Sequence, residues 1–165
     1  MIAVYPGSFD PVTNGHLDII VRATRIFGDV IVAVGQNASK SNLFPAGERV
    51  AMLAAATAGL DGVRALPMTG LLADFCRAHG ADVIVKGVRF AGDLDYELQM
   101  AHVNAQLTGV ETVLLPASRE WGTISSTMVR EVARHGGDVS AFVPGVVSEL
   151  IVRAASHIHK EDTHG

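Results

Sequence analysis

Short apolar runs rich in β-branched residues recur along the chain, and longer segments with helical spacing separate them. The runs are continuous rather than alternating in polarity, which is typical of strands buried on both faces of a parallel sheet. The predicted strands are Ile2–Tyr5, Val30–Val34, Val63–Leu66, Val83–Lys86 and Thr112–Leu115. This alternation restricts the chain to an α/β fold in which each connection carries a helix across the sheet.

The intervening segments predict helices on both faces of that sheet. Residues 16–27 carry an apolar stripe, residues 48–58 are rich in alanine, and a glycine follows residues 71–79. The predicted helices are His16–Phe27, Glu48–Ala58, Leu71–His79, Asp93–Leu107, Ser125–His135 and Val146–Ala155. We therefore expect one α/β domain over residues 1–165, with an open parallel five-stranded sheet and a frayed polar tail over residues 156–165.

Composition argues against several classes of protein. Lys and Arg number 13 against 17 Asp and Glu, a net charge of −4, so we expect no nucleic-acid partner. No apolar run reaches the roughly 18–20 residues of a membrane span, and no signal-peptide pattern is present, so we expect a cytoplasmic protein without membrane contact. Because CxxC and HExxH pairs are also absent, we expect no metal site built by the protein itself.

The loop after the first predicted strand has the residues of a phosphate site. Ligands of open α/β sheets bind beyond the carboxyl ends of the strands, and residues 5–16 join such an end to a helix. Gly7 allows a close turn, Ser8 supplies a hydroxyl, and Thr13 or its neighbour can cap the helix that contains His16. Free N–H groups and the positive end of the helix dipole favour an anion there. Such loops also join strands to helices without binding anything, so a structural role stays open.

A second hydroxyl-rich segment, Trp121–Arg130, leads into a later helix. Ser125 can cap that helix, while Ser126 and Thr127 can face an anion. An ordinary helix N-cap accounts for the same residues. The segment alone therefore does not identify a site.

The two segments together resemble the bacterial phosphopantetheine adenylyltransferase family of HxGH nucleotidyltransferases. The pair reads GSFDPVTNGH at residues 7–16 and ISSTMVR at residues 124–130. The resemblance continues through Ser39 and Lys40, VKGVR at residues 85–89, DLDYELQMAHVN at residues 93–104 and EVARHGGDV at residues 131–139. It covers residues 1–155 and implies a Rossmann-like, dinucleotide-binding-type nucleotidyltransferase fold.

The resemblance implies transfer of AMP from ATP to 4′-phosphopantetheine, giving dephospho-coenzyme A and pyrophosphate in coenzyme A biosynthesis. A phosphate monoester is already nucleophilic, so we expect direct in-line displacement with no covalent intermediate. Mg²⁺ is the expected cofactor, bound through the ATP phosphates. The resemblance also implies a homohexamer and coenzyme A as a feedback ligand.

The resemblance further assigns roles to individual residues. It implies that His16 stabilises the α-phosphate in the transition state, with Lys40 and Arg89 as further catalytic cations. The implied ATP-binding residues are Ser8, Phe9, His16, Gly87, Val88, Arg89, Glu97, Trp121, Gly122, Thr123, Ile124, Ser125, Ser126 and Thr127. The implied acceptor-binding residues are Ser8, Lys40, Leu72 and Lys86. Without the resemblance, Lys40 would be a solvated surface lysine and Glu97 a carboxylate that faces water.

The chain departs from the family pattern at several places, of which Phe90 and Gly122 are expected to be tolerated variants. Thr13 replaces the first histidine of HxGH, as is usual in this branch, so His16 must act alone. Lys86 stands where many relatives carry arginine, which keeps the charge but loses the planar, two-pronged grip on a phosphate. Ser8 replaces threonine and keeps the hydroxyl.

Three other functions stay open at this point. A sibling nucleotidyltransferase that uses another acceptor, such as nicotinamide mononucleotide, or CTP as donor would share ISSTMVR, although residues 93–104 favour phosphopantetheine. A nucleotide sensor without catalysis would share the fold, but the combination of His16, Lys40 and Arg89 favours an enzyme. A flavodoxin-like signalling domain would need a phospho-acceptor aspartate at a strand end, and the residues after Asp10 suit a nucleotide better.

Overall fold

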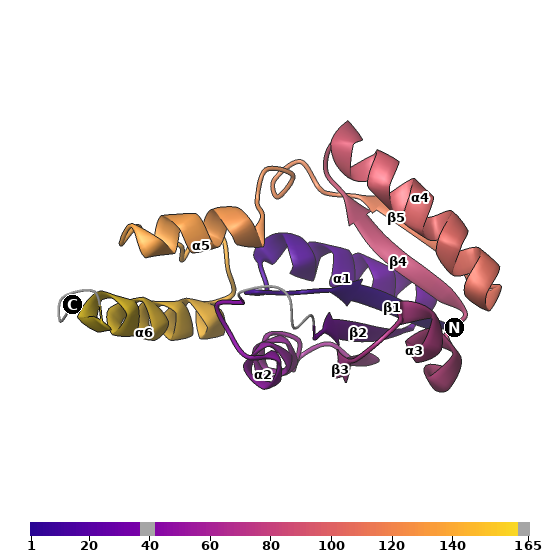
Figure 1. Cartoon of the computed structure of the whole chain (residues 1–165), viewed down its shortest axis with the longest axis horizontal. Helices are drawn as coiled ribbons and strands as arrows, with labels where there is room; N and C mark the ends of the chain where they lie inside the picture. The colour runs from indigo at the N-terminus through magenta and orange to yellow at the C-terminus, as the bar shows by residue number, and fades with distance from the viewer. Residues whose placement is uncertain (37–41, 162–165) are drawn as a thin grey trace.

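The computed structural model describes residues 1–36 and 42–161, with side chains as far as Arg153 in the last helix. Its centre is a sheet of parallel strands in the order β3-β2-β1-β4-β5 (Figure 1). The strands are β1 (Ile2–Gly7), β2 (Asp29–Gly35), β3 (Val63–Met68), β4 (Val83–Val88) and β5 (Glu111–Pro116). Each strand contains one of the predicted runs, and the predicted open parallel sheet is confirmed.

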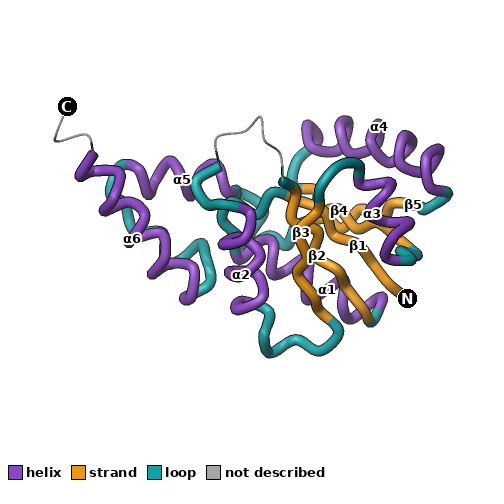
Figure 2. Tube along the Cα trace, turned by 60° about the horizontal axis from the view of Figure 1, so that its bottom comes forward, coloured by secondary structure: helices purple, strands orange, loops and turns teal. Residues whose placement is uncertain are grey.

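Helices cover both faces of the sheet, as predicted. The helices are α1 (Asn14–Phe27), α2 (Ala46–Ala56), α3 (Leu72–His79), α4 (Ala91–Thr108), α5 (Ser126–Arg134) and α6 (Gly145–Glu161). α1 and α2 enclose the larger core on one face, while α3 packs against the other face through Phe75 and Cys76. α5 and α6 lie side by side beyond the carboxyl ends of the strands (Figures 1 and 2). Within residues 1–36 and 42–161, no helix has both the length and the apolar character needed to cross a membrane.

Several helix bounds differ from the prediction for local reasons. α1 begins before His16, because Thr13 serves as its N-cap. α2 begins directly after Pro45, a residue that fits the start of a helix but not its interior. α6 continues past the predicted end at Ala155 to Glu161, and no glycine or proline interrupts this stretch of sequence.

The neighbouring strands β1 and β4 separate toward their carboxyl ends. Pairing between β1 and β4 ends at Val4 and Ile84, whereas β1 pairs with β2 as far as Gly7 and Val34. Pro6, in the part of β1 that pairs with β2 but not with β4, has no N–H to donate. This gap is also where the strand order reverses, with β2 and β3 on one side and β4 and β5 on the other. Crevices at such points are the usual ligand sites of open α/β sheets.

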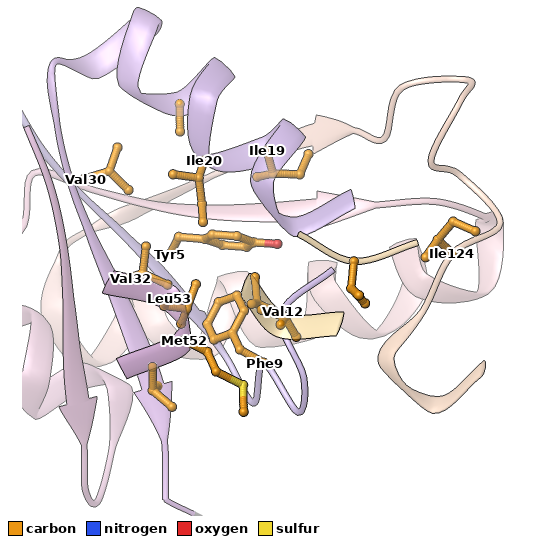
Figure 3. Close-up of a cluster of buried hydrophobic side chains, with 14 of the residues drawn as sticks. Tyr5, Phe9, Val12, Ile19, Ile20, Val30, Val32, Met52, Leu53 and Ile124 are labelled. Atoms are coloured by element: carbon orange, nitrogen blue, oxygen red, sulfur yellow. The ribbon is translucent and has the colours of Figure 1, made fainter. Parts of the chain in front are cut away.

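An aromatic cluster supports the loop after β1 (Figure 3). The rings of Tyr5 and Phe9 meet edge to face with centroids 5.3 Å apart, and the Phe9 ring lies 5.0 Å from that of His16. Phe9 is buried although its φ of 49° lies in the left-handed region that such residues rarely adopt. Gly7 makes room for its ring, because a Cβ there would lie 2.9 Å from Phe9 Cζ. Burial of Phe9 therefore fixes the course of the loop beside His16.

Candidate active site

A first cavity of about 310 Å³ lies where β1 and β4 separate. It is bounded by the ends of those strands, the loop after β1, the first turn of α1, the start of α4 and the second hydroxyl-rich segment. The predicted ATP-binding residues that line it are Phe9, His16, Gly87, Arg89, Glu97, Trp121, Ile124, Ser125, Ser126 and Thr127. The rest of its wall is made by Tyr5, Pro6, Gly7, Thr13, Gly15, Ile19, Lys86, Asp93 and Ala117.

A second cavity of about 490 Å³ adjoins the first. The predicted acceptor-binding residues Ser8, Leu72 and Lys86 line it. The residues that line both cavities are Pro6, Gly7, Lys86 and Glu97. The remaining lining residues are Gly35, Gln36, Met68, Gly70, Tyr96, Met100, Ala101, Asn104 and Thr112. The two cavities thus meet at the gap between β1 and β4.

The second cavity has a wall of mixed polarity. Met68 and Met100 supply apolar surface, while Asn104 is a buried polar residue. The hydroxyl of Thr112 is buried and has no hydrogen-bond partner within the described part of the chain. Buried polar atoms are normally paired. This cavity therefore suits a ligand that carries both apolar groups and hydrogen-bonding groups.

His16 is fixed by the cap of α1. The Thr13 hydroxyl accepts the His16 N–H at 3.3 Å, and His16 Nδ1 accepts the Thr13 N–H at 3.0 Å. This is a reciprocal capping box with histidine in place of the usual Glu or Gln. Because a main-chain N–H can only donate, Nδ1 is unprotonated and the neutral ring carries its proton on Nε2. Among the described residues Nε2 has no partner, so it is left to donate to a ligand in the first cavity.

The His16 ring is uncharged at neutral pH. Burial and, to a smaller extent, the Arg89 guanidinium lower its pKa from 6.5 to about 4. The unfolded chain takes up this proton near pH 6.5, while the folded protein excludes it until about pH 4. The stability that this difference confers is present above pH 6.5 and is lost as the pH falls toward 4. His16 therefore acts as a neutral N–H donor in the free protein.

We expect NMR titration of the His16 side-chain nitrogens to show the Nε2–H tautomer at pH 7 and a pKa of about 4. Removing the neighbouring charge in Arg89→Met should raise that pKa. A proton on Nδ1 at pH 7, or protonation of the ring near pH 6.5, would contradict this description of the site.

Arg89 is held beside the first cavity by Asp93. Its Nε donates to Asp93 Oδ2 at 2.9 Å, and Nη2 donates to Oδ1 at 3.2 Å. Nη1 donates to the Ile124 carbonyl at 3.5 Å, so the guanidinium connects the end of β4 with the second hydroxyl-rich segment. The side-chain hydrogen bonds from Arg89 lower the pKa of Asp93. The pair is half-buried, so an entering phosphate can reach the guanidinium.

Lys86 and Glu97 form an ion pair at the boundary between the cavities. Lys86 Nζ lies 3.1 Å from Glu97 Oε1, and both side chains are largely buried. Charges in such surroundings are screened less by salt than exposed ones. The family resemblance implies that Lys86 binds the acceptor and that Glu97 binds ATP. In the structure, each of these residues lines both cavities.

The second hydroxyl-rich segment is tied to the loop after β1. Ser125 caps α5 by accepting a main-chain N–H three residues ahead at 3.1 Å. Ser126 Oγ donates to the Pro11 carbonyl at 2.7 Å, and Arg130 Nη1 donates to the Asp10 carbonyl at 2.6 Å. The Ser126 hydroxyl therefore donates its proton to a main-chain carbonyl rather than to a ligand. This differs from the expectation that it faces an anion.

Not every predicted residue lies at the cavity expected for it. Ser8 lines the second cavity rather than the first. Among the described residues, Val88, Gly122 and Thr123 line neither cavity. Lys40 lies outside the described residues, so its catalytic and acceptor-binding roles stay predictions.

Some residues of the site are not recognisable from the sequence. Asp93 has a signal, since its i,i+4 spacing from Arg89 is that of an ion pair on or beside a helix. Asp10 lies in the GSFDPVTNGH motif, but its bonds to main-chain groups far away in the sequence are not evident from it, and Arg49 has no signal at all.

The described residues contain no group of three or more His, Cys, Asp or Glu side chains that could hold a metal ion. The carboxylates at the first cavity, Asp93 and Glu97, are each paired with a cation. This donor set suits Mg²⁺ only where phosphate oxygens and water supply most of its ligands.

Comparisons with known proteins identify the relatives of this chain. A family model described as cytidylyltransferase-like matches residues 4–132. The chain is 51% identical over 157 residues to the phosphopantetheine adenylyltransferase of Cutibacterium acnes, covering 95% of this chain and 100% of the relative. It is 57% identical over 145 residues to that of a Nocardioides species, covering 88% and 91%. A crystal structure described as a nicotinate-nucleotide adenylyltransferase from Vibrio parahaemolyticus has a TM-score of 0.69 at 19% identity and 93% coverage of both chains, which shows a shared fold.

Proposed function

The chain belongs to the phosphopantetheine adenylyltransferase family of cytidylyltransferase-like proteins, and we propose that its two adjoining cavities hold the two substrates side by side. The protein transfers the adenylyl group of ATP to 4′-phosphopantetheine, releasing pyrophosphate and giving dephospho-coenzyme A for coenzyme A biosynthesis. ATP occupies the first cavity and 4′-phosphopantetheine the second. The observation that carries this arrangement is that four residues line both cavities at the gap between β1 and β4.

The shape and chemistry of the cavities support this assignment. The pantetheine arm is elongated, carries amides, and ends in a thiol, which suits the mixed wall of Met68, Met100, Asn104 and Thr112. Its phosphate end would point toward Ser8 and Lys86, where the two cavities meet. ATP would then present its α-phosphate to the same place.

The transfer is a direct displacement at the α-phosphorus. An acceptor phosphate oxygen forms the new P–O bond, and the bond from the α-phosphorus to the bridging oxygen of pyrophosphate breaks. The acceptor phosphate is already anionic, so no general base is needed, and the protein contributes by positioning the groups and stabilising charge. His16 Nε2–H donates to the α-phosphate, the N-terminus of α1 adds its dipole, and Arg89 binds the phosphates that leave. Lys40 remains a proposed further cation.

Mg²⁺ accompanies ATP in this proposal. It would be held by the phosphates and water, with no cage of protein carboxylates, and would neutralise charge on the leaving pyrophosphate. The steps assigned to His16 and Arg89 do not depend on its position.

Pyrophosphate release tests the function. ATP and Mg²⁺ are supplied with 4′-phosphopantetheine, and nicotinamide mononucleotide serves as the control acceptor. We expect release only with 4′-phosphopantetheine. Release only with nicotinamide mononucleotide would replace the acceptor, and no release with either acceptor from folded protein that binds ATP would indicate a sensor.

Self-association is a further part of the proposal, with the homohexamer as its specific form. α4 exposes large apolar side chains, among them Tyr96 at 62% and Leu107 at 50% exposure, with Val103 one turn before Leu107. Contiguous exposed apolar surface usually marks an interaction site. A second copy of the chain is the occupant that we propose for this face of α4.

Light scattering with size-exclusion chromatography tests that part. Wild-type protein is expected to elute as a hexamer, and Val103→Asp with Leu107→Asp to elute as a smaller species, because two carboxylates would be buried without partners. Ile26→Asp, at an exposed apolar position on α1, is the matched control and should elute as wild type. A hexamer that survives both substitutions in α4 would exclude this face from the interface.

We propose the cytoplasm as the place where the protein acts.

Coenzyme A is proposed as a feedback ligand of the same cavities. Coenzyme A contains both the pantetheine arm and the adenylyl group of the product, so it can occupy both cavities at once. It should compete with 4′-phosphopantetheine in steady-state kinetics. Inhibition that excess 4′-phosphopantetheine does not relieve would place it at another site.

A further inference from the structure

Arg49 is a buried cation bound to main-chain oxygens. Its side chain, in the second turn of α2, is 1% exposed. Its Nη1 donates to the carbonyls of Ser8 at 2.6 Å and Gly35 at 3.0 Å, and its Nε donates to the carbonyl of Phe44 at 3.0 Å. Among the described residues no carboxylate forms an ion pair with it. Burying a guanidinium costs free energy unless hydrogen bonds compensate for its lost hydration, and here three carbonyl oxygens do so.

Two of the three carbonyls that Arg49 binds belong to residues that line the second cavity. Ser8 and Gly35 both line that cavity and lie directly beyond Gly7 and Val34, the last residues that pair β1 with β2. The sheet no longer connects the two main chains at this point. Arg49 Nη1 takes the place of the missing ladder and holds them at a fixed separation.

Asp10 also holds the main chain at Phe44, the residue whose carbonyl Arg49 binds. Its buried carboxylate accepts the N–H groups of Leu43 at 2.8 Å and Phe44 at 2.9 Å, while Arg49 takes the Phe44 carbonyl. Hydrogen bonds therefore hold both the N–H group and the carbonyl group of Phe44. The negative charge of Asp10 is itself near another cation, since Arg130 Nη1 lies 3.9 Å from its Oδ2.

We propose that Arg49 is a positioning residue for the acceptor, which sets the distance between Ser8 and Gly35 without touching either substrate. This inference rests on the proposed function, because it takes the second cavity as the acceptor site. The planar fork is essential to the role, since one guanidinium satisfies three carbonyls at fixed angles. A lysine ammonium would keep the charge but would lose this geometry.

The test compares Arg49→Lys and Arg49→Met with a control from the same helix. Leu53 lies one turn further along α2, is fully buried, and contacts neither Ser8 nor Gly35 through a hydrogen bond, so Leu53→Ala reports on loss of packing alone. Titration calorimetry gives the dissociation constants for 4′-phosphopantetheine and for a non-hydrolysable ATP analogue. Steady-state kinetics give kcat and both KM values.

We expect Arg49→Lys to weaken acceptor binding about tenfold or more, with ATP-analogue binding changed by less than about threefold. kcat at saturating acceptor should fall less than the acceptor KM rises. Leu53→Ala should lower Tm and leave the acceptor dissociation constant near that of wild type. Arg49→Met should follow Arg49→Lys with a larger effect, and Arg49→Lys alone decides the matter if the Met variant does not fold.

Two outcomes would overturn the proposal. One is acceptor binding unchanged in folded Arg49→Lys, and the other is equal loss for both ligands in parallel with Leu53→Ala. If wild-type protein itself failed to bind 4′-phosphopantetheine, the proposed function would fail first and this inference with it. The wild-type titration therefore separates the two failures.

Discussion

Replacing His16 by alanine is expected to lower turnover by about 10²–10⁴-fold while ATP binding changes little. In the proposed mechanism Nε2–H donates to charge that develops on the α-phosphate during transfer, and an interaction made mainly in the transition state affects kcat more than substrate binding. Single-turnover kinetics with saturating ATP and acceptor measure the effect directly. The capping bond between Thr13 and His16 is lost as well, so the melting temperature must be measured beside the rate.

A glutamine at the same position sharpens the test. His16→Gln keeps a neutral N–H donor near the position of Nε2, so it should recover part of the turnover lost in His16→Ala. It should do so equally at pH 6 and pH 8, because a neutral donor needs no protonation. Near-normal turnover in His16→Ala with ATP bound would refute the role given to this residue.

Replacing Arg89 by methionine is expected to reduce kcat/KM for ATP by about 10²–10³-fold. Arg89 is a cation at the wall of the first cavity, and its contacts with Asp93 and the Ile124 carbonyl aim it there. Arg89→Lys keeps the charge but loses the paired hydrogen bonds to Asp93, so its activity should lie between those of wild type and Arg89→Met. Steady-state kinetics with ATP varied measure both variants.

Asp93→Asn is the companion change. It weakens the hold on Arg89 without removing the cation, so the loss should be smaller than in Arg89→Met. Activity of Arg89→Met within about threefold of wild type would show that the guanidinium serves only the Asp93 pair. A larger loss in Asp93→Asn than in Arg89→Met would reverse the roles of the two residues.

The sheet and the main loops of the site follow from local patterns in the sequence. Continuous apolar runs such as Val30–Val34 are typical of strands buried on both faces, and parallel strands bring their carboxyl ends to one edge. The loop that holds His16 and the segment that holds Ser125 therefore had to face the same side. In the structure, residues of both motifs line the same cavity.

The connections between these parts could not be read in the same way. The opening between β1 and β4 depends on where pairing stops, at Val4 and Ile84, and no local propensity encodes that point. Arg49 looks like an ordinary charged residue of an amphipathic helix, yet it binds the Ser8 carbonyl 41 residues away in sequence. Likewise, the choice of Ser126 between a ligand and the Pro11 carbonyl is decided by the packing of α5 against the loop after β1.

The proposed mechanism is one direct transfer at the α-phosphorus between ligands in two adjoining cavities. Its most direct test is the stereochemistry of the reaction with a single diastereomer of adenosine 5′-(1-thiotriphosphate), with the configuration of the thio-substituted dephospho-coenzyme A determined by ³¹P NMR. A single in-line displacement by the acceptor phosphate predicts inversion at the phosphorus. Retention would require two successive displacements through an adenylylated protein group, and would contradict the account.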